Sequence, residues 1–316
     1  MRPREVWITL ALVSMTLAQA AGAVVPKPPS ASASEPRKEQ LRKEWQNYNQ
    51  MVSDMKNDLF ATLDKTELQT VNKIEIRVEG GLDGTKGDDV QNCYALMDNG
   101  HPAVLLGQGF LRSLWYFIES LIYAEKYRAY DKHEKYIGFV LTSWQSNLTA
   151  ASENRPPRFI PSPSEYFHWN KATIDTVDEA ASPVWAEAVA CVLAHEVGHH
   201  VLKHTSRNYL AEPLPAKRRA EEDADAWATS TLCRAGHPPL FGGAAIAYLQ
   251  ALYDDLGSNT THPADACRSR ALFVASIEQA DKFKDGLAAK GHTPADLRRV
   301  LKARLAQFDA TGACKH

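Results

Sequence analysis

The sequence predicts a mainly helical α+β fold with a small mixed sheet in its first half. Apolar residues recur at helical spacing over several long stretches, whereas only two short stretches show the pattern of a strand. Hydrophobic residues make up 44% of the 316 residues, which is enough to bury a sizeable core. We therefore expect one folded unit in which helices dominate.

The two predicted strands differ in character. Residues 73–78 alternate between charged and apolar side chains, as a half-buried strand does. Residues 103–106 form a short apolar run that follows Asn99 and Gly100, a pair typical of a tight turn. Residues 147–163 contain several prolines and serines and are predicted to be a loop.

Helices are predicted wherever apolar residues recur every three to four positions. Proline near the first position and glycine or proline after the last one help to set their ends, as at Gly236. The predicted helices cover residues 41–71, 110–130, 183–204, 215–233, 244–256, 268–284 and 294–308.

The N-terminus has the layout of a secretory signal peptide. Arg2 and Arg4 precede an uncharged stretch over residues 6–25, and small residues predict cleavage after residue 20 or 23. The alternative is a retained membrane anchor, since the stretch is nearly long enough to span a bilayer. With a signal peptide at 1–23, a flexible Pro- and Ser-rich leader follows at 24–40, and a single domain covers 41–316.

Charge and cysteine content limit the classes of protein. A net charge of -2, with both signs mixed along the chain, gives no electrostatic footprint for nucleic acid. No segment after the signal is apolar enough to cross a bilayer, so we expect no integral membrane span. Five cysteines permit up to two disulfides whose connectivity the sequence does not define. Because Cys191 falls within a predicted helix, we expect Cys267 to pair with Cys314.

The motif that carries most chemistry is His195-Glu196-Val197-Gly198-His199. Residues four apart on a helix differ by about 40° around its axis, so His195 and His199 can hold the same metal ion. Zinc in such a position activates a water molecule, and Glu196 can take the proton as that water attacks a carbonyl group. We therefore expect His195 and His199 to be ligands and Glu196 to be the general base.

A third ligand is expected on the following predicted helix. A catalytic zinc site needs three protein ligands and one position open for water. Glu221 is the best candidate, and Asp225, one turn further along, could orient a ligand histidine through its other ring nitrogen. Glu222 and Asp223 are expected to point away as a solvated acidic face.

With these residues the sequence resembles the M48 peptidases, gluzincins that combine His-Glu-x-x-His with a later Glu-x-x-Ala-Asp. Two further blocks are similar to that family: His262-Pro263 followed by Arg268, and residues 92–95 leading into a strand over residues 100–109. The resemblance implies a zincin-like metallopeptidase domain with an active-site helix and one Zn²⁺ per chain.

The resemblance also implies roles for further residues. His262 and Arg268 would approach the scissile carbonyl and stabilise the oxyanion. Asn92 would contact the substrate backbone, and Ala103 and Leu105 would lie on the strand that borders the cleft and pairs with extended substrate.

The chain departs from the M48 pattern through a predicted insertion at about residues 112–182. Its aromatic side chains could cover the cleft and restrict substrates, or they could simply pack against one another. The function predicted from the sequence is a zinc-dependent endopeptidase acting on exported proteins, with a bacterial periplasm as its expected location. Two alternatives are a chaperone-like binding module with structural zinc and a zinc hydrolase of non-peptide substrates.

Overall fold

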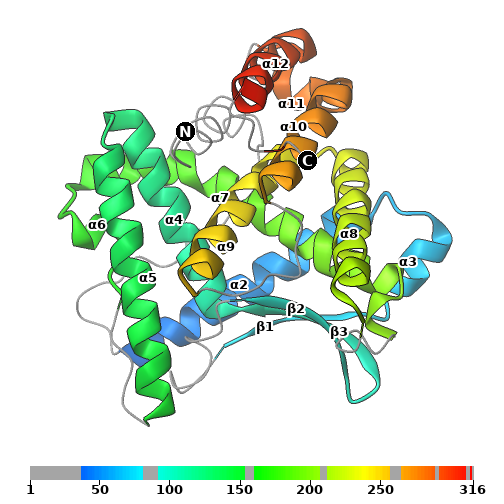
Figure 1. The fold of residues 1–316 in the computed structure, drawn as a ribbon, viewed down its shortest axis with the longest axis horizontal. Helices are drawn as coiled ribbons and strands as arrows, with labels where there is room; N and C mark the ends of the chain where they lie inside the picture. The colour runs from blue at the N-terminus through cyan, green and yellow to red at the C-terminus, as the bar shows by residue number, and fades with distance from the viewer. Residues whose placement is uncertain are drawn as a thin grey trace.

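The structure, a computed structural model, describes residues 37–80, 92–153, 160–206, 212–256, 265–288, 292–310 and 314. Helices dominate this part of the chain, and a small mixed sheet lies among them, which confirms the predicted fold class. The long helix α7 (Lys171–Val201) crosses the middle of the molecule, with the sheet on one side and the C-terminal helices on the other (Figure 1). The signal peptide and most of the leader lie outside the described residues.

The sheet has the strand order β1-β3-β2. Strand β3 (His101–Gly107) pairs in parallel with β1 (Glu75–Glu79) and antiparallel with β2 (Cys93–Asp98). The predicted turn at Asn99 and Gly100 joins β2 to β3, and both residues have positive φ angles of 50° and 83°. A two-residue turn of this kind matches the twist of a hairpin, so it pairs β2 with β3. Because β1 pairs with the other side of β3, β3 is the central strand and β2 is an edge strand.

The N-terminal helical region is two helices and not the single one predicted. Helix α2 (Arg37–Phe60) begins within the expected leader, and α3 (Lys65–Val71) follows after a short turn. The break occurs at Asp64, whose side chain accepts hydrogen bonds from the backbone N–H groups of Thr66 and Glu67. An aspartate that caps free N–H groups in this way begins a new helix.

The predicted insertion contributes to the core. Helix α4 (Gln108–Tyr127) is buried along most of its length and packs against α7. Helix α5 (Tyr130–Ser152) extends into the predicted loop, and the short α6 (Pro163–Tyr166) follows. Aromatic side chains of this region stack on one another, with ring centroids 4.3 Å apart for Tyr123 and Trp169. The division of the chain at residues 112 and 182 remains a prediction.

Helix α7 begins twelve residues before the predicted start. The side chain of Asn170 caps it by accepting a hydrogen bond from the Thr173 N–H, and Pro183 lies inside the helix. The sequence predicts Pro183 at the first position of this helix, because proline has no N–H to donate within a helix. Here the strong cap at Asn170 and the buried apolar face on both sides of Pro183 override that local preference.

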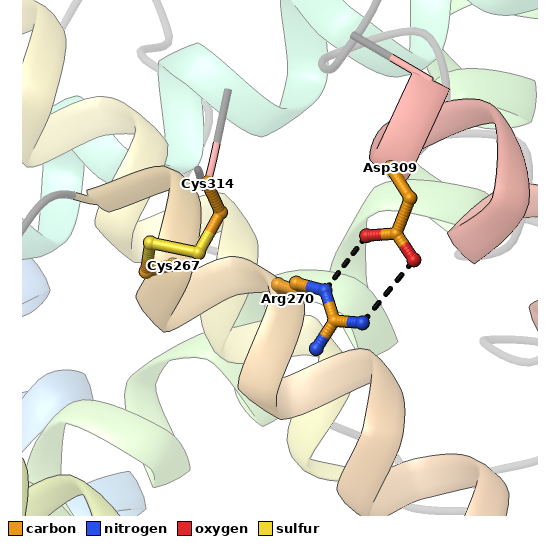
Figure 2. The surroundings of a disulfide bond; sticks show 4 residues. All are labelled: Cys267, Arg270, Asp309 and Cys314. Carbon is orange, nitrogen blue, oxygen red and sulfur yellow. Dashed lines mark hydrogen bonds and ion pairs between the residues drawn. A yellow bond between two sulfur atoms is a disulfide. The ribbon is translucent and has the colours of Figure 1, made fainter. Parts of the chain in front are cut away.

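Helices α8 (Leu214–Ala235), α9 (Gly242–Leu256) and α12 (Pro294–Ala310) agree with prediction to within a few residues. The single helix predicted over residues 268–284 is instead divided into α10 (Asp265–Glu278), a 3₁₀ helix (Ala280–Phe283) and α11 (Lys284–Ala288). Gly236 ends α8 in the left-handed conformation, with φ of 85°. No described helix is long and apolar enough to cross a membrane. The predicted pairing of Cys267 with Cys314 is present and joins the start of α10 to the C-terminal segment (Figure 2).

Candidate metal centre

Helices α7 and α8 bring the three predicted ligands together. His195 and His199 lie one turn apart on α7, and Glu221 faces them from the first half of α8. All three side chains are buried, and one ligand atom from each lies within 4.8 Å of the others. Among the described His, Cys, Asp and Glu side chains, His195, His199 and Glu221 form a group whose geometry could hold a metal ion.

The spacing of the ligand atoms fits a tetrahedral ion. The two Nε2 atoms of His195 and His199 are 3.2 Å apart, and Glu221 Oε2 is 3.2 Å from His195 Nε2. Glu221 Oε1 is 3.6 Å from His199 Nε2. Tetrahedral zinc with bonds of about 2.05 Å separates its ligands by about 3.3 Å, so the observed distances need little adjustment.

Each histidine ring is held at its other nitrogen. Asp225 Oδ1 lies 2.9 Å from Nδ1 of His195, as the sequence led us to expect. His204 Nδ1 lies 3.0 Å from Nδ1 of His199, a contact that sequence reasoning missed. Both Nε2 atoms are thereby directed toward Glu221, which is the arrangement that metal-binding histidines require. A histidine five residues after the motif was the one available signal for His204.

The charges around His195 are strongly coupled. Burial alone would lower the pKa of His195, but hydrogen bonds with Asp225 and Glu221 outweigh it and raise that pKa to about 10. Burial would likewise raise the pKa of Asp225, but the positive charge of Arg268 and the bond with His195 hold it well below its usual range. The site therefore favours one positive charge between the carboxylates, which a metal cation can supply in place of a proton.

Arg268 makes a contact that the sequence did not predict. Its Nε and Nη2 atoms donate to the two carboxylate oxygens of Asp225 at 2.6 and 2.8 Å. The guanidinium thus contacts the carboxylate that holds His195, because a planar donor pair matches a carboxylate geometrically. Arg268 also lines the cavity beside the candidate ligands, and the oxyanion role that the M48 resemblance implied stays a prediction. His262, its expected companion, lies outside the described residues.

A cavity of about 1240 Å³ opens on the metal centre. The three candidate ligands line it together with Glu196, Asn92, the β2 residues from Cys93 to Met97, and side chains of α8, α9 and α10. Glu196 is partly exposed beside the ligands, where a general base for an attacking water would have to lie.

The expected substrate-binding strand was misplaced. Ala103 and Leu105 are buried on the central strand β3, whose two edges are occupied by β1 and β2. The Ala103 carbonyl also accepts a hydrogen bond from His200 Nε2 at 2.9 Å. The strand that faces the cavity is β2, and Asn92, the residue before it, also lines the cavity. The Asn92 side chain accepts a hydrogen bond from the Cys93 N–H.

The fold and this site define a zincin-like α+β protein with a buried His-His-Glu group. The sequence model of the Peptidase U49 family matches residues 104–282, more than half of the chain, and the protein therefore belongs to the Peptidase U49 family. It is a peptidase, and a peptidase acts on proteins or peptides. No curated protein and no solved structure matches the chain.

The family match corrects the resemblance to the M48 peptidases. The matching blocks were short, and His-Glu-x-x-His with a later glutamate arises wherever two helices supply three ligands to one ion. Short blocks of this kind do not distinguish one family from another. The site residues predicted from the motif itself are independent of the family name.

Proposed function

We propose that this peptidase is a zinc-dependent endopeptidase that hydrolyses peptide bonds in exported proteins. One observation carries the proposal: His195, His199 and Glu221 converge in a buried group, with both histidine rings held at Nδ1. A purely structural zinc site is typically closed by four protein ligands, whereas three ligands beside a cavity leave a position for water.

The donor set favours zinc. Two imidazole nitrogens and one carboxylate suit zinc, whereas calcium and magnesium prefer sites built from oxygen atoms alone. The ligand distances of 3.2 and 3.6 Å support the same assignment, because they are close to those of a tetrahedral site.

The chain supplies the other parts of a hydrolytic site. When bound, zinc contributes Lewis-acid activation of water and of the scissile carbonyl. Glu196 takes the proton of the attacking water and passes it to the leaving amine. The outer edge of β2, which lines the cavity, is available in the described structure to pair with an extended peptide.

An exported location is supported by two features. The N-terminus has the composition of a signal peptide, and the Cys267–Cys314 disulfide is typical of an oxidising compartment. We propose a bacterial periplasm as that compartment and exported proteins as the substrates.

Zinc content and casein cleavage in three variants test the proposal. Glu196→Gln should retain zinc and lose at least about 10²-fold of the activity, because the base is removed while the ligands stay. Glu221→Ala should lose both zinc and activity. The matched control is Asp223→Ala, which removes an exposed carboxylate two residues away and should leave both unchanged.

Either of two results would contradict the proposal. Wild-type activity in the Glu196→Gln variant would exclude this residue as the base. Bound zinc in a wild-type protein that cleaves no member of a broad peptide library would instead support a non-catalytic module or a hydrolase of other substrates.

A further inference from the structure

We propose that Arg268 is a positioning residue and that the C-terminal segment of the chain fixes it in place, so that zinc affinity depends on the Cys267–Cys314 disulfide. The inference rests on the proposed zinc site, and it concerns residues that do not touch the ion. It links the redox state of a disulfide to the metal centre.

Arg268 is joined to His195 through a single carboxylate. Its two donors engage both oxygens of Asp225 at 2.6 and 2.8 Å, and Asp225 Oδ1 lies 2.9 Å from His195 Nδ1. The Arg268 side chain is only 10% exposed. A carboxylate gripped at both oxygens cannot rotate away from the histidine, so Arg268 fixes the direction in which His195 presents Nε2.

The backbone around Arg268 needs external support. Arg268 lies in the first turn of α10, which begins at Asp265. The N–H groups of a first turn have no partner within the helix, and helix ends fray more readily than helix centres. The position of the guanidinium therefore depends on whatever holds this turn.

Two ties to the C-terminal segment flank Arg268. Cys267, the preceding residue, is joined to Cys314 across a sequence separation of 47 residues (Figure 2). Arg270, two residues after Arg268, donates to both carboxylate oxygens of Asp309 on α12 at 2.7 and 3.2 Å (Figure 2). The exposed ion pair contributes little alone, so the disulfide is the principal tie.

Zinc affinity follows from this chain of contacts. Two-electron reduction of the disulfide by an added phosphine, which becomes the phosphine oxide, leaves free thiols at Cys267 and Cys314. The first turn of α10 can then fray, which loosens the contact of Arg268 with Asp225. His195 then samples orientations that do not face Glu221. Removing a partner of a metal-binding histidine lowers metal affinity by about 10- to 100-fold, and loosening it should have a smaller effect of the same sign.

The experiment measures the zinc dissociation constant of the full chain by competition with a chromophoric chelator. Arg268→Met should weaken zinc binding by about 10- to 100-fold, and Arg268→Lys, which keeps the charge without the paired donors, by less. Cys314→Ser and the reduced wild type should both show a loss of about 3- to 10-fold. A reductant that does not itself bind zinc is required.

Two controls separate positioning from general destabilisation. Cys314→Ser treated with the same reductant should show no further loss, because its tie is already absent. Asp281→Asn breaks the exposed ion pair with Arg298 on α12, and this pair does not flank Arg268. The variant should therefore bind zinc as the wild type does. Circular dichroism of each variant checks that its helices remain folded.

The outcomes distinguish this inference from the proposed function. A wild type that binds no zinc contradicts the proposed zinc site. If the wild type binds zinc and Arg268→Met or the reduced protein binds it with the same affinity, only the inference about Arg268 is contradicted. Equal losses in Arg268→Lys, Arg268→Met and Asp281→Asn would also overturn it, because general destabilisation would then explain the data.

Discussion

His204 has a defined chemical state if His199 binds a metal. A ligand histidine offers the lone pair of Nε2 to the ion and carries its proton on Nδ1. His199 Nδ1 must therefore donate the 3.0 Å hydrogen bond, and His204 Nδ1 must accept it. As long as it stays bonded to His199, His204 is therefore neutral and carries its proton on Nε2. The bonded pair allows only one tautomer of each ring.

We expect His204→Ala to weaken zinc binding by about 10- to 100-fold, because His199 loses the partner that orients it. The chelator competition assay measures this change. The matched control is His200→Gln, a change at a neighbouring buried histidine that bonds to the Ala103 carbonyl and Thr205. That control should lower the free energy of unfolding by about 1 kcal/mol and leave zinc affinity unchanged. Similar zinc affinity in His204→Ala and the wild type would remove His204 from the site.

At this scale the sequence predicted what a single helix or a local motif determines. His195, His199 and Asp225 could be assigned because four-residue spacing places side chains on one face. His204 was missed because it follows the end of α7 in a short 3₁₀ turn, where helical spacing no longer applies. The true contact of Arg268 was missed because it depends on how α10 packs against α8, which spacing along the chain does not define.

At the scale of elements, the metal centre depends on a close approach of α7 and α8. Gly198 lies on α7 just before His199 and faces Ala224 and Trp227 of α8. A Cβ atom at this position would lie 3.1 Å from Trp227 Cε3 and 3.4 Å from the Ala224 carbonyl oxygen. The missing side chain therefore sets the separation of the helices that carry His195 and Glu221.

We expect Gly198→Val to push α8 away from α7 and to abolish stoichiometric zinc binding. The branched side chain has no room beside Trp227, whose Nε1 donates to Glu67 at 3.0 Å and so resists movement. Zinc content by atomic emission and thermal melting measure the result. The control is Gly138→Ala on α5, where nothing lies within 4 Å of the new Cβ, and it should stabilise the protein by about 0.5 to 1 kcal/mol. Full zinc content in Gly198→Val would show that the helices can separate without harm to the site.

The order of the strands is the part of the element arrangement that the sequence did not predict. The strands over residues 73–78 and 103–106 were identified, whereas β2 was not predicted as a strand and the edge of the sheet was misassigned. The run Ala103-Val104-Leu105-Leu106 lacks the alternation of a half-buried strand, which indicates burial on both faces and favours a central position. Pairing between strands is a tertiary property, so only this indirect signal was available.

At the scale of the whole molecule, most helices and the fold class could be predicted because each long helix has its own apolar periodicity. Errors concentrated at junctions. Asp64 begins a second helix where one was expected, and Asn170 caps α7, which begins twelve residues before Pro183. The M48 assignment failed for a related reason, since it used the short blocks around the metal and not the arrangement of the whole chain.

Three distant elements meet at His237, which follows the end of α8. Its Nδ1 lies 2.9 Å from Glu187 on α7, and its Nε2 lies 3.1 Å from Asp58 on α2. Glu187 is buried, whereas the Asp58 side chain is 72% exposed, so Glu187 is the stronger partner. Burial would lower the pKa of His237, but the carboxylates outweigh it and raise that pKa to about 9.

This cluster predicts a stability that declines at alkaline pH. The folded pKa of about 9 is above the ordinary value of 6.5, so the folded state retains a proton that the unfolded state has released. The stabilisation is fully present below pH 6.5 and is lost as the pH rises to about 9. With allowance for solvent screening at the partly exposed ring, we expect about 2 kcal/mol at pH 6.

Urea unfolding of the wild type and His237→Gln, followed by circular dichroism from pH 6 to pH 10, measures this contribution. Glutamine keeps a polar side chain but carries no charge, so the difference in unfolding free energy should be largest at pH 6 and close to zero at pH 10. Taking the difference between the two unfolding free energies at each pH removes the contribution of all other titrating groups. His101→Gln, at an exposed histidine at the start of β3, should track the wild type at every pH. A difference that stays constant across this range would mean that His237 joins the three helices by packing and hydrogen bonding, without the charge.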